Sequence, residues 1–394
     1  MLETIKTINP VKSKKKVGKK SFLRRLNDGL HLWMGLISGL VVFIVSITGC
    51  IYVFQNEIRH LTQPWLKVEA QDQPYVSPAK LLEVAQKIYP NRTPSGLTYG
   101  SNSESAAVGF DQFKQGSNFA VVFMNPYDAK VLKAYVPDDH FDFFEFIENG
   151  HRNLWLPPAI GRKVVGISIL IFLFLLLTGL VMWWPKKWKK PFLRKALTIK
   201  WNARFRRVVH DLHNVLGFYS LIFAFLLAAT GLFYSFKWFE NGIYYVTSVG
   251  ETKVAEEHPH SSIPTSTQEL PSFSNRLEKA WQKVMSEQKS KPGGMYMSPV
   301  SNAADDPIEI VVYRRPGSFY DHRAYFFDQY TLKPLRAKGE DYQAANFADK
   351  LSALNYDIHV GSVWGWSSKL LAFIISLICA SMPITGFLYW WNRK

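Results

Sequence analysis

The sequence has 394 residues, of which 47% are hydrophobic and 15% aromatic, so it is long enough for several domains. Its 47 Lys and Arg against 31 Asp and Glu give a formal net charge of +16. These cations gather beside apolar segments, with nine Lys or Arg in residues 1–25 and ten in residues 186–207. We therefore expect no nucleic-acid partner, and we assign the basic clusters to membrane topology and to contact with anionic membrane lipid.

Four apolar segments are long enough to cross a bilayer as helices. Each contains at least 21 consecutive residues without Asp, Glu, Lys or Arg, and about 20 apolar residues span the hydrocarbon core. The first is too long for the apolar part of a signal peptide and no small-residue cleavage site follows it, so we expect a retained anchor. We place the spanning helices at residues 30–54, 164–184, 208–236 and 367–391.

The distribution of Lys and Arg predicts the orientation of these helices. Basic residues are retained on the cytoplasmic side, which places residues 1–29, residues 185–207 and both termini in the cytoplasm. The loops 55–163 and 237–366 then face the opposite compartment.

Each of these two loops predicts a small α+β domain. Ser77 is a candidate N-cap before a helix whose apolar residues lie on one face, and strands are expected at 106–110, 118–124 and 130–136. The second loop predicts a helix at 273–287 and strands at 308–313, 323–328 and 332–337. The predicted fold class is therefore an α-helical four-helix transmembrane bundle with two α+β domains.

The sequence also repeats internally. His31 and His213 each precede a Thr-Gly pair by 17 residues, in "TGCIYVF" and "TGLFYSF". His151 precedes "TGLVMWWPKK" by 27 residues, and His359 precedes "TGFLYWWNRK" by 26. We interpret the chain as a two-fold internal repeat of helix, outer domain and helix.

The four repeated histidines are candidate metal ligands. A single histidine at a helix end is readily explained by a bond to a backbone carbonyl or a lipid headgroup, but four at equivalent positions point to function. Imidazoles that face each other in a bundle suit the axial positions of haem iron, and without a CxxCH motif any haem would be b-type. We expect two haems, between His31 and His213 near the cytoplasmic face and between His151 and His359 near the other.

Several glycines could make room for a flat macrocycle, although ordinary helix packing explains them equally well. They are Gly35, Gly39, Gly49, Gly166, Gly179, Gly217 and Gly231.

His210 competes with His213, because it lies three residues earlier and on a similar helical face. Asp28 stands at the matching place before His31, so His213 is the better candidate. His210 would then contact a haem propionate, exchange protons or remain solvated, and nearby arginines could also reach the propionates. The other histidines lie in loops without repeat partners and are expected at the surface: His60, His140, His258, His260 and His322.

The segments "LHLWMGL", "GHRNLWLPPAIGRKVVG", "HDLHNVLG" and "IHVGSVWG", with the TG and WW pairs after them, resemble the PepSY-associated transmembrane family over about residues 22–394. The resemblance implies a bacterial inner-membrane protein with two b haems and two periplasmic PepSY-like domains. It places the axial ligands at His31, His151, His213 and His359. Some members continue into a flavodoxin-like, NADPH-binding reductase, whereas this sequence stops at Lys394. We therefore expect its electron donor to be a separate reductase or a membrane quinol.

Family members that resemble ferric-siderophore reductases imply a function for this chain. It would be a haem-dependent oxidoreductase that reduces a ferric siderophore on the periplasmic side and so serves iron transport. Two alternatives stay open. The chain could be a haem electron-transfer subunit for another periplasmic acceptor, or a non-redox PepSY protein that binds or inhibits a peptidase.

Overall fold

The computed structural model describes residues 21–111, 119–136, 142–185, 187–253, 259–264, 272–288, 291–298, 304–337 and 339–392. Within these residues, four helices are long and apolar enough to cross a membrane. They are α1 (Phe22–Tyr52), α5 (Pro158–Trp183), α7 (Phe205–Ser235) and α11 (Trp366–Trp391). They match the four predicted segments, although α1 and α5 begin several residues earlier.

The four long helices form a closed bundle. Both α1 and α7 pack against α5 and α11. Val42, Phe172 and Ile375 are among the apolar side chains buried between the helices. Gly39 lets α1 approach α11 closely, since a Cβ there would lie 3.2 Å from the Cβ of Pro383. Many large apolar side chains on the outside of the bundle stay exposed, as expected for helices that face lipid.

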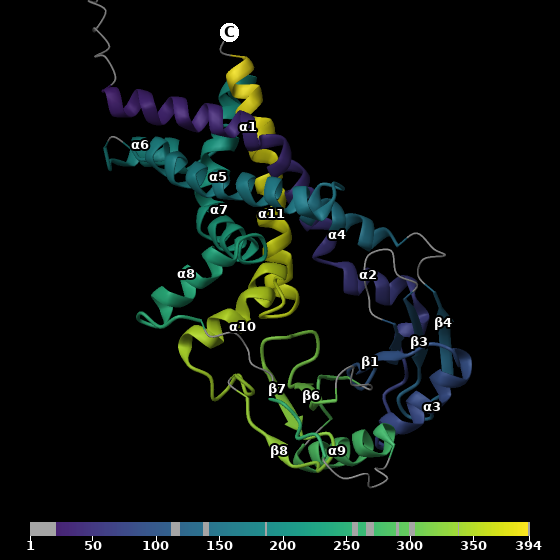
Figure 1. Cartoon of the computed structure of the whole chain (residues 1–394). Helices are drawn as coiled ribbons and strands as arrows, with labels where there is room; N and C mark the ends of the chain where they lie inside the picture. The colour runs from purple at the N-terminus through teal and green to yellow at the C-terminus, as the bar shows by residue number, and fades with distance from the viewer. Residues whose placement is uncertain are drawn as a thin grey trace, which may run out of the picture.

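The two ends of the bundle differ (Figure 1). At one end lie the start of α1, the short helix α6 (Lys190–Leu197) and the end of α11. We call this the basic end, because the Lys- and Arg-rich residues 187–207 are there. The opposite end carries the β-sheet and is called the sheet end.

Five short helical segments line the sheet end. They are α2 (Gln55–Thr62), the 3-10 helix η1 (Pro64–Leu66), α4 (Phe143–Asn153), α8 (Lys237–Thr247) and α10 (Phe347–Val360). The helix α4 packs on α1 and α5, and α10 packs on α7, α8 and α11. Both end at a left-handed residue, Leu154 (φ 55°) and Gly361 (φ 75°), which turns the chain towards the next spanning helix. A Cβ on Gly361 would lie 2.8 Å from the Ser368 carbonyl oxygen, so glycine is required there.

The strands of both loops form one antiparallel sheet in the order β4-β3-β2-β1-β5-β6-β7-β8. From the first loop come β1 (Pro94–Tyr99), β2 (Ala106–Phe110), β3 (Ala120–Met124) and β4 (Val131–Tyr135). From the second come β5 (Gly294–Met297), β6 (Ile308–Tyr313), β7 (His322–Phe327) and β8 (Pro334–Leu335). The sequence predicts two separate domains, whereas the pairing of β1 with β5, which sets Leu97 opposite Met297, joins them.

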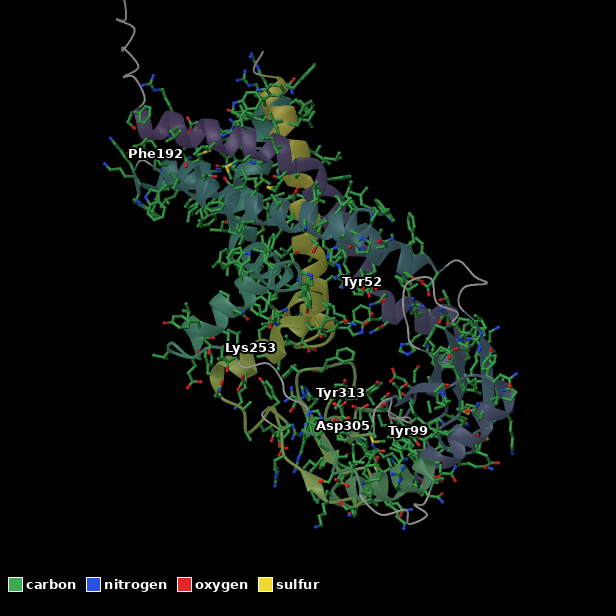
Figure 2. All side chains as sticks on the ribbon, viewed as in Figure 1. Tyr52, Tyr99, Phe192, Lys253, Asp305 and Tyr313 are labelled. Atoms are coloured by element: carbon green, nitrogen blue, oxygen red, sulfur yellow. The ribbon has the colours of Figure 1, made fainter. Side chains whose placement is uncertain are left out.

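Two helices cover one face of this sheet and pack against each other: α3 (Pro78–Ile88) and α9 (Phe273–Glu287). Both were predicted, and the Ser77 hydroxyl caps α3 by accepting from the Lys80 N–H. Tyr99 of β1, labelled in Figure 2, lies in the core shared by both halves. It stacks on Trp281 of α9 with ring centroids 6.5 Å apart. The hydrophobic core therefore continues across the junction between the halves.

Candidate functional site

The bundle brings the four repeated histidines together as two pairs. His31 of α1 and His213 of α7 lie at the basic end with ring centroids 6.2 Å apart. His151 of α4 and His359 of α10 lie at the sheet end with centroids 6.0 Å apart. These are the pairs predicted from the repeat. The 17 residues of α1 from His31 to the sheet-end residue Thr48 correspond to about 25 Å along the helix.

Each imidazole contacts a threonine of another helix through its Nδ1 atom. The threonine is always the first residue of one of the four Thr-Gly pairs. The Nδ1 to Oγ1 distances are 2.9 Å for His31 and Thr178, 3.0 Å for His213 and Thr385, 3.3 Å for His151 and Thr48, and 3.0 Å for His359 and Thr230. The Thr-Gly pairs, which mark the repeat in the sequence, are thus the places where neighbouring helices hold the histidines.

The glycine of each pair leaves space for the same imidazole. A Cβ would lie 3.2 Å or 3.3 Å from the imidazole Cε1 atom at Gly49 (His151), Gly179 (His31), Gly231 (His359) and Gly386 (His213). Ordinary carbon contacts begin at about 3.5 Å. An alanine at any of these positions would therefore press on the ring. Three of these glycines were among those noted in the sequence, and Gly386 was missed, although its Thr-Gly pair carried the signal.

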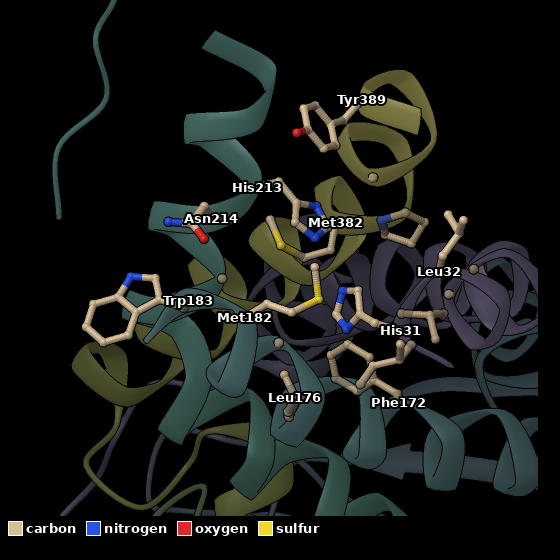
Figure 3. Close-up of a pocket in the computed structure, with 18 of the residues that line it drawn as sticks. His31, Leu32, Phe172, Leu176, Met182, Trp183, His213, Asn214, Met382 and Tyr389 are labelled. Atoms are coloured by element: carbon tan, nitrogen blue, oxygen red, sulfur yellow. The ribbon is translucent and has the colours of Figure 1, made fainter. Parts of the chain in front are cut away.

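A cavity of about 430 Å³ surrounds the basic-end pair, within the usual size range of cofactor pockets. Figure 3 shows His31 and His213 close together within it, with Met182 and Met382 beside them. The walls are mainly apolar and include Val42, Phe172 and Leu176. Polar side chains also line the cavity: Arg24, Asp28, His210, Asn214 and Tyr389.

His210 occupies a different position from His213. It lines the same cavity, but its Nδ1 lies 3.3 Å from Asp211 Oδ1 and its ring centroid 5.0 Å from that of Tyr389. The buried Asp211 carboxylate also pairs with Arg207 at 2.8 Å. The structure thus places His213, and not His210, opposite His31.

Burial favours the neutral form of both sheet-end imidazoles. Burial lowers the pKa of His359 to about 4, with a further contribution from the nearby His151. Burial also lowers the pKa of His151. A neutral imidazole has a free lone pair on one ring nitrogen and can bind a metal.

The spacing within both pairs would fit a haem iron held between the two imidazoles. Two metal–nitrogen bonds of about 2 Å, each extended by about 1 Å from the nitrogen to the ring centre, give roughly 6 Å between centroids. Because Nδ1 faces a threonine in every case, Nε2 is the nitrogen left for the metal. Two axial imidazoles suit a macrocycle that brings its own four nitrogens.

The remaining histidines lie away from both pairs where they are described. His60 faces Glu104 at 3.2 Å, and His260 faces Asp305 at 3.1 Å. The His322 Nδ1 lies 3.0 Å from the Phe319 carbonyl oxygen. His140 and His258 lie outside the described residues.

The four long apolar helices identify a multi-pass membrane protein. This protein also contains two histidine pairs and an antiparallel sheet. The family model described as the PepSY-associated TM region matches residues 29–393. The chain therefore belongs to this family, as the sequence motifs suggested. No curated protein matches the chain.

Proposed function

We propose that this protein binds two b haems, one between His31 and His213 and one between His151 and His359, and carries electrons across the bacterial inner membrane. The observation that carries the proposal is the double occurrence of one geometry: two imidazoles about 6 Å apart, each bonded through Nδ1 to a threonine. The recurrence also supports an internal two-fold repeat, since in all four Thr-Gly pairs the threonine contacts an imidazole and the glycine leaves space for it.

The chain's own residues would bind and orient the cofactors. When bound, haem supplies a one-electron couple at each pair. Nε2 of each histidine would bind the iron, and the apolar walls of the basic-end cavity would exclude water. Arg24, His210 and Tyr389 line that cavity and are the candidate partners for the propionates.

The charge distribution supports an outward direction of transfer. With residues 186–207 on the cytoplasmic side, the basic-end pair would receive electrons there and the sheet-end pair would deliver them in the periplasm. The donor would be a separate reductase or a membrane quinol.

The proposed acceptor is Fe(III) held by a siderophore near the sheet-end pair. One electron converts Fe(III) to Fe(II), and a chelator of anionic oxygens holds the less charged ion more weakly. Reduction would thus release the iron for uptake. Phe143 and Phe146 on α4, the helix that carries His151, and Trp155 just after it have exposed aromatic side chains that offer a surface for an organic chelate.

The test is stopped-flow oxidation of pre-reduced protein by ferric hydroxamate and ferric catecholate chelates, followed at the haem bands. His359→Ala should abolish rapid oxidation of the remaining haem, because the delivering site is lost. His322→Ala is the matched control, since this imidazole lies on β7 and bonds the Phe319 carbonyl, and it should behave as the wild type. If His359→Ala is oxidised as fast as the wild type, electrons leave by another route.

Two results of this experiment would favour the other functions. Haem-containing protein that ferric chelates do not oxidise, but a copper complex or a partner reductase does, would indicate a different periplasmic acceptor. Protein that contains no haem despite adequate supply would favour a non-redox PepSY role in binding a peptidase.

A further inference from the structure

The hydroxyl hydrogens of the four threonines are already used within their own helices. Each threonine donates to the backbone carbonyl four residues earlier, a local bond that Ser and Thr commonly make in helices. The distances are 2.7 Å from Thr48 to Ile44, 3.0 Å from Thr178 to Phe174, 2.8 Å from Thr230 to Leu226 and 2.8 Å from Thr385 to Ser381. The hydroxyl oxygens are therefore left as acceptors.

This arrangement fixes the tautomer of the histidines. A hydroxyl has one hydrogen, so an oxygen that already donates can only accept from the Nδ1 atom that faces it. At the sheet end a second contact leads to the same result. The Nδ1 atoms of His151 and His359 lie 2.9 Å and 3.1 Å from the carbonyl oxygens of Val45 and Leu227, which can only accept. The hydrogen is thus on Nδ1, and Nε2 carries the lone pair.

Two asparagines add a second link between the threonine and the histidine helix. Asn27 lies four residues before His31 and donates to the Thr178 carbonyl at 3.2 Å. Asn355 lies four residues before His359 and donates to the Thr230 carbonyl at 3.3 Å. At both places a second hydrogen bond therefore ties the threonine helix to the helix that carries the histidine.

We infer that the threonine that faces each histidine is a positioning residue and sets the reduction potential of the haem that the histidine binds. The four threonines are Thr48, Thr178, Thr230 and Thr385. This inference rests on the proposed haem binding. An acceptor on Nδ1–H makes Nε2 a stronger donor and fixes the ring. A stronger donor stabilises ferric over ferrous iron, so the threonines lower the potential.

The experiment replaces the hydroxyl by a methyl group of similar size. Thr178→Val at the basic end should raise the midpoint potential of one haem in a spectroelectrochemical titration. Thr230→Val at the sheet end should raise the potential of the other haem by less, because the Leu227 carbonyl still accepts from Nδ1 of His359. Both substitutions should also shift the low-spin EPR signal of the affected haem and weaken its retention by about 10- to 100-fold. Thr178→Ser and Thr230→Ser keep the hydroxyl and should restore wild-type potentials.

Thr247→Val is the matched control. Thr247 lies on α8 and also donates to a carbonyl four residues earlier, that of Ile243 at 2.8 Å, but it is not one of the four threonines that face a histidine. It makes the same chemical change and should leave both potentials unaltered. Haem-loaded Thr178→Val and Thr230→Val proteins with wild-type potentials and EPR signals would overturn the inference and leave the proposed function standing. Wild-type protein without haem would instead overturn the proposed function.

Discussion

Gly386 offers a sharp test of the basic-end site, because its replacement by alanine adds only one methyl group. In Gly386→Ala the new Cβ would lie 3.2 Å from Cε1 and 3.6 Å from Nδ1 of His213. Carbon atoms pack best at about 3.5–4.0 Å, so the ring must retreat by roughly 0.3 Å or more. Metal–ligand distances tolerate only about 0.2 Å. We expect about 10- to 100-fold weaker retention of one haem, the usual effect of disturbing a ligand's support.

Gly29→Ala is the control for this change. Gly29 lies on α1, and a Cβ there would meet nothing within 4 Å. Both substitutions gain about 1 kcal/mol of helix propensity, so a difference between them reports the contact with His213. The assay is transfer of haem from each purified protein to excess apomyoglobin, followed by absorbance. Equal transfer from Gly386→Ala and Gly29→Ala would refute the reasoning.

Three further outcomes are expected. His210→Ala should retain both haems, because His213 faces His31, and loss of one haem in haem quantification would reverse that assignment. A reporter that works only outside the cytoplasm should be active when fused at Asn125 or Gly293. Activity of a cytoplasmic reporter at these positions would show that the predicted orientation is inverted. Leu97→Ala removes a fully buried side chain from the shared sheet core and should destabilise the sheet by about 2–5 kcal/mol in denaturant unfolding while the haem bands persist. Loss of colour at the same denaturant concentration would show that sheet and bundle unfold as one unit.

The four spanning helices and the helices α3 and α9 were predictable because apolar length and amphipathic period are local properties. The short helices α4 and α10, which carry His151 and His359, were not predicted. The sheet was less predictable. The strands β1 and β5 were not predicted, since "PSGLTY" contains Pro and Gly and "GMYM" has only four residues. Their pairing, which sets Leu97 opposite Met297, depends on a contact between residues 200 positions apart in the chain. Two domains were therefore expected where one continuous sheet is found.

The candidate site was also predictable only in part. Repeat spacing was sufficient to pair His31 with His213 and His151 with His359. It could not assign each Thr-Gly pair to its histidine, because helical periodicity gives the face of a helix and not the neighbour that meets it. The contact of Thr178 with His31 joins α1 to α5 across 147 positions and follows only from the packing of the bundle.

The central claim is that two histidine pairs each hold one haem. The most direct measurement is haem quantification by the pyridine haemochrome method, together with the optical spectrum, for wild-type protein, His31→Ala and His359→Ala produced with adequate haem. We predict two haems for each wild-type chain and one for each variant, with low-spin spectra throughout. Wild-type protein without a Soret band, or variants with the same haem content as the wild type, would contradict the claim.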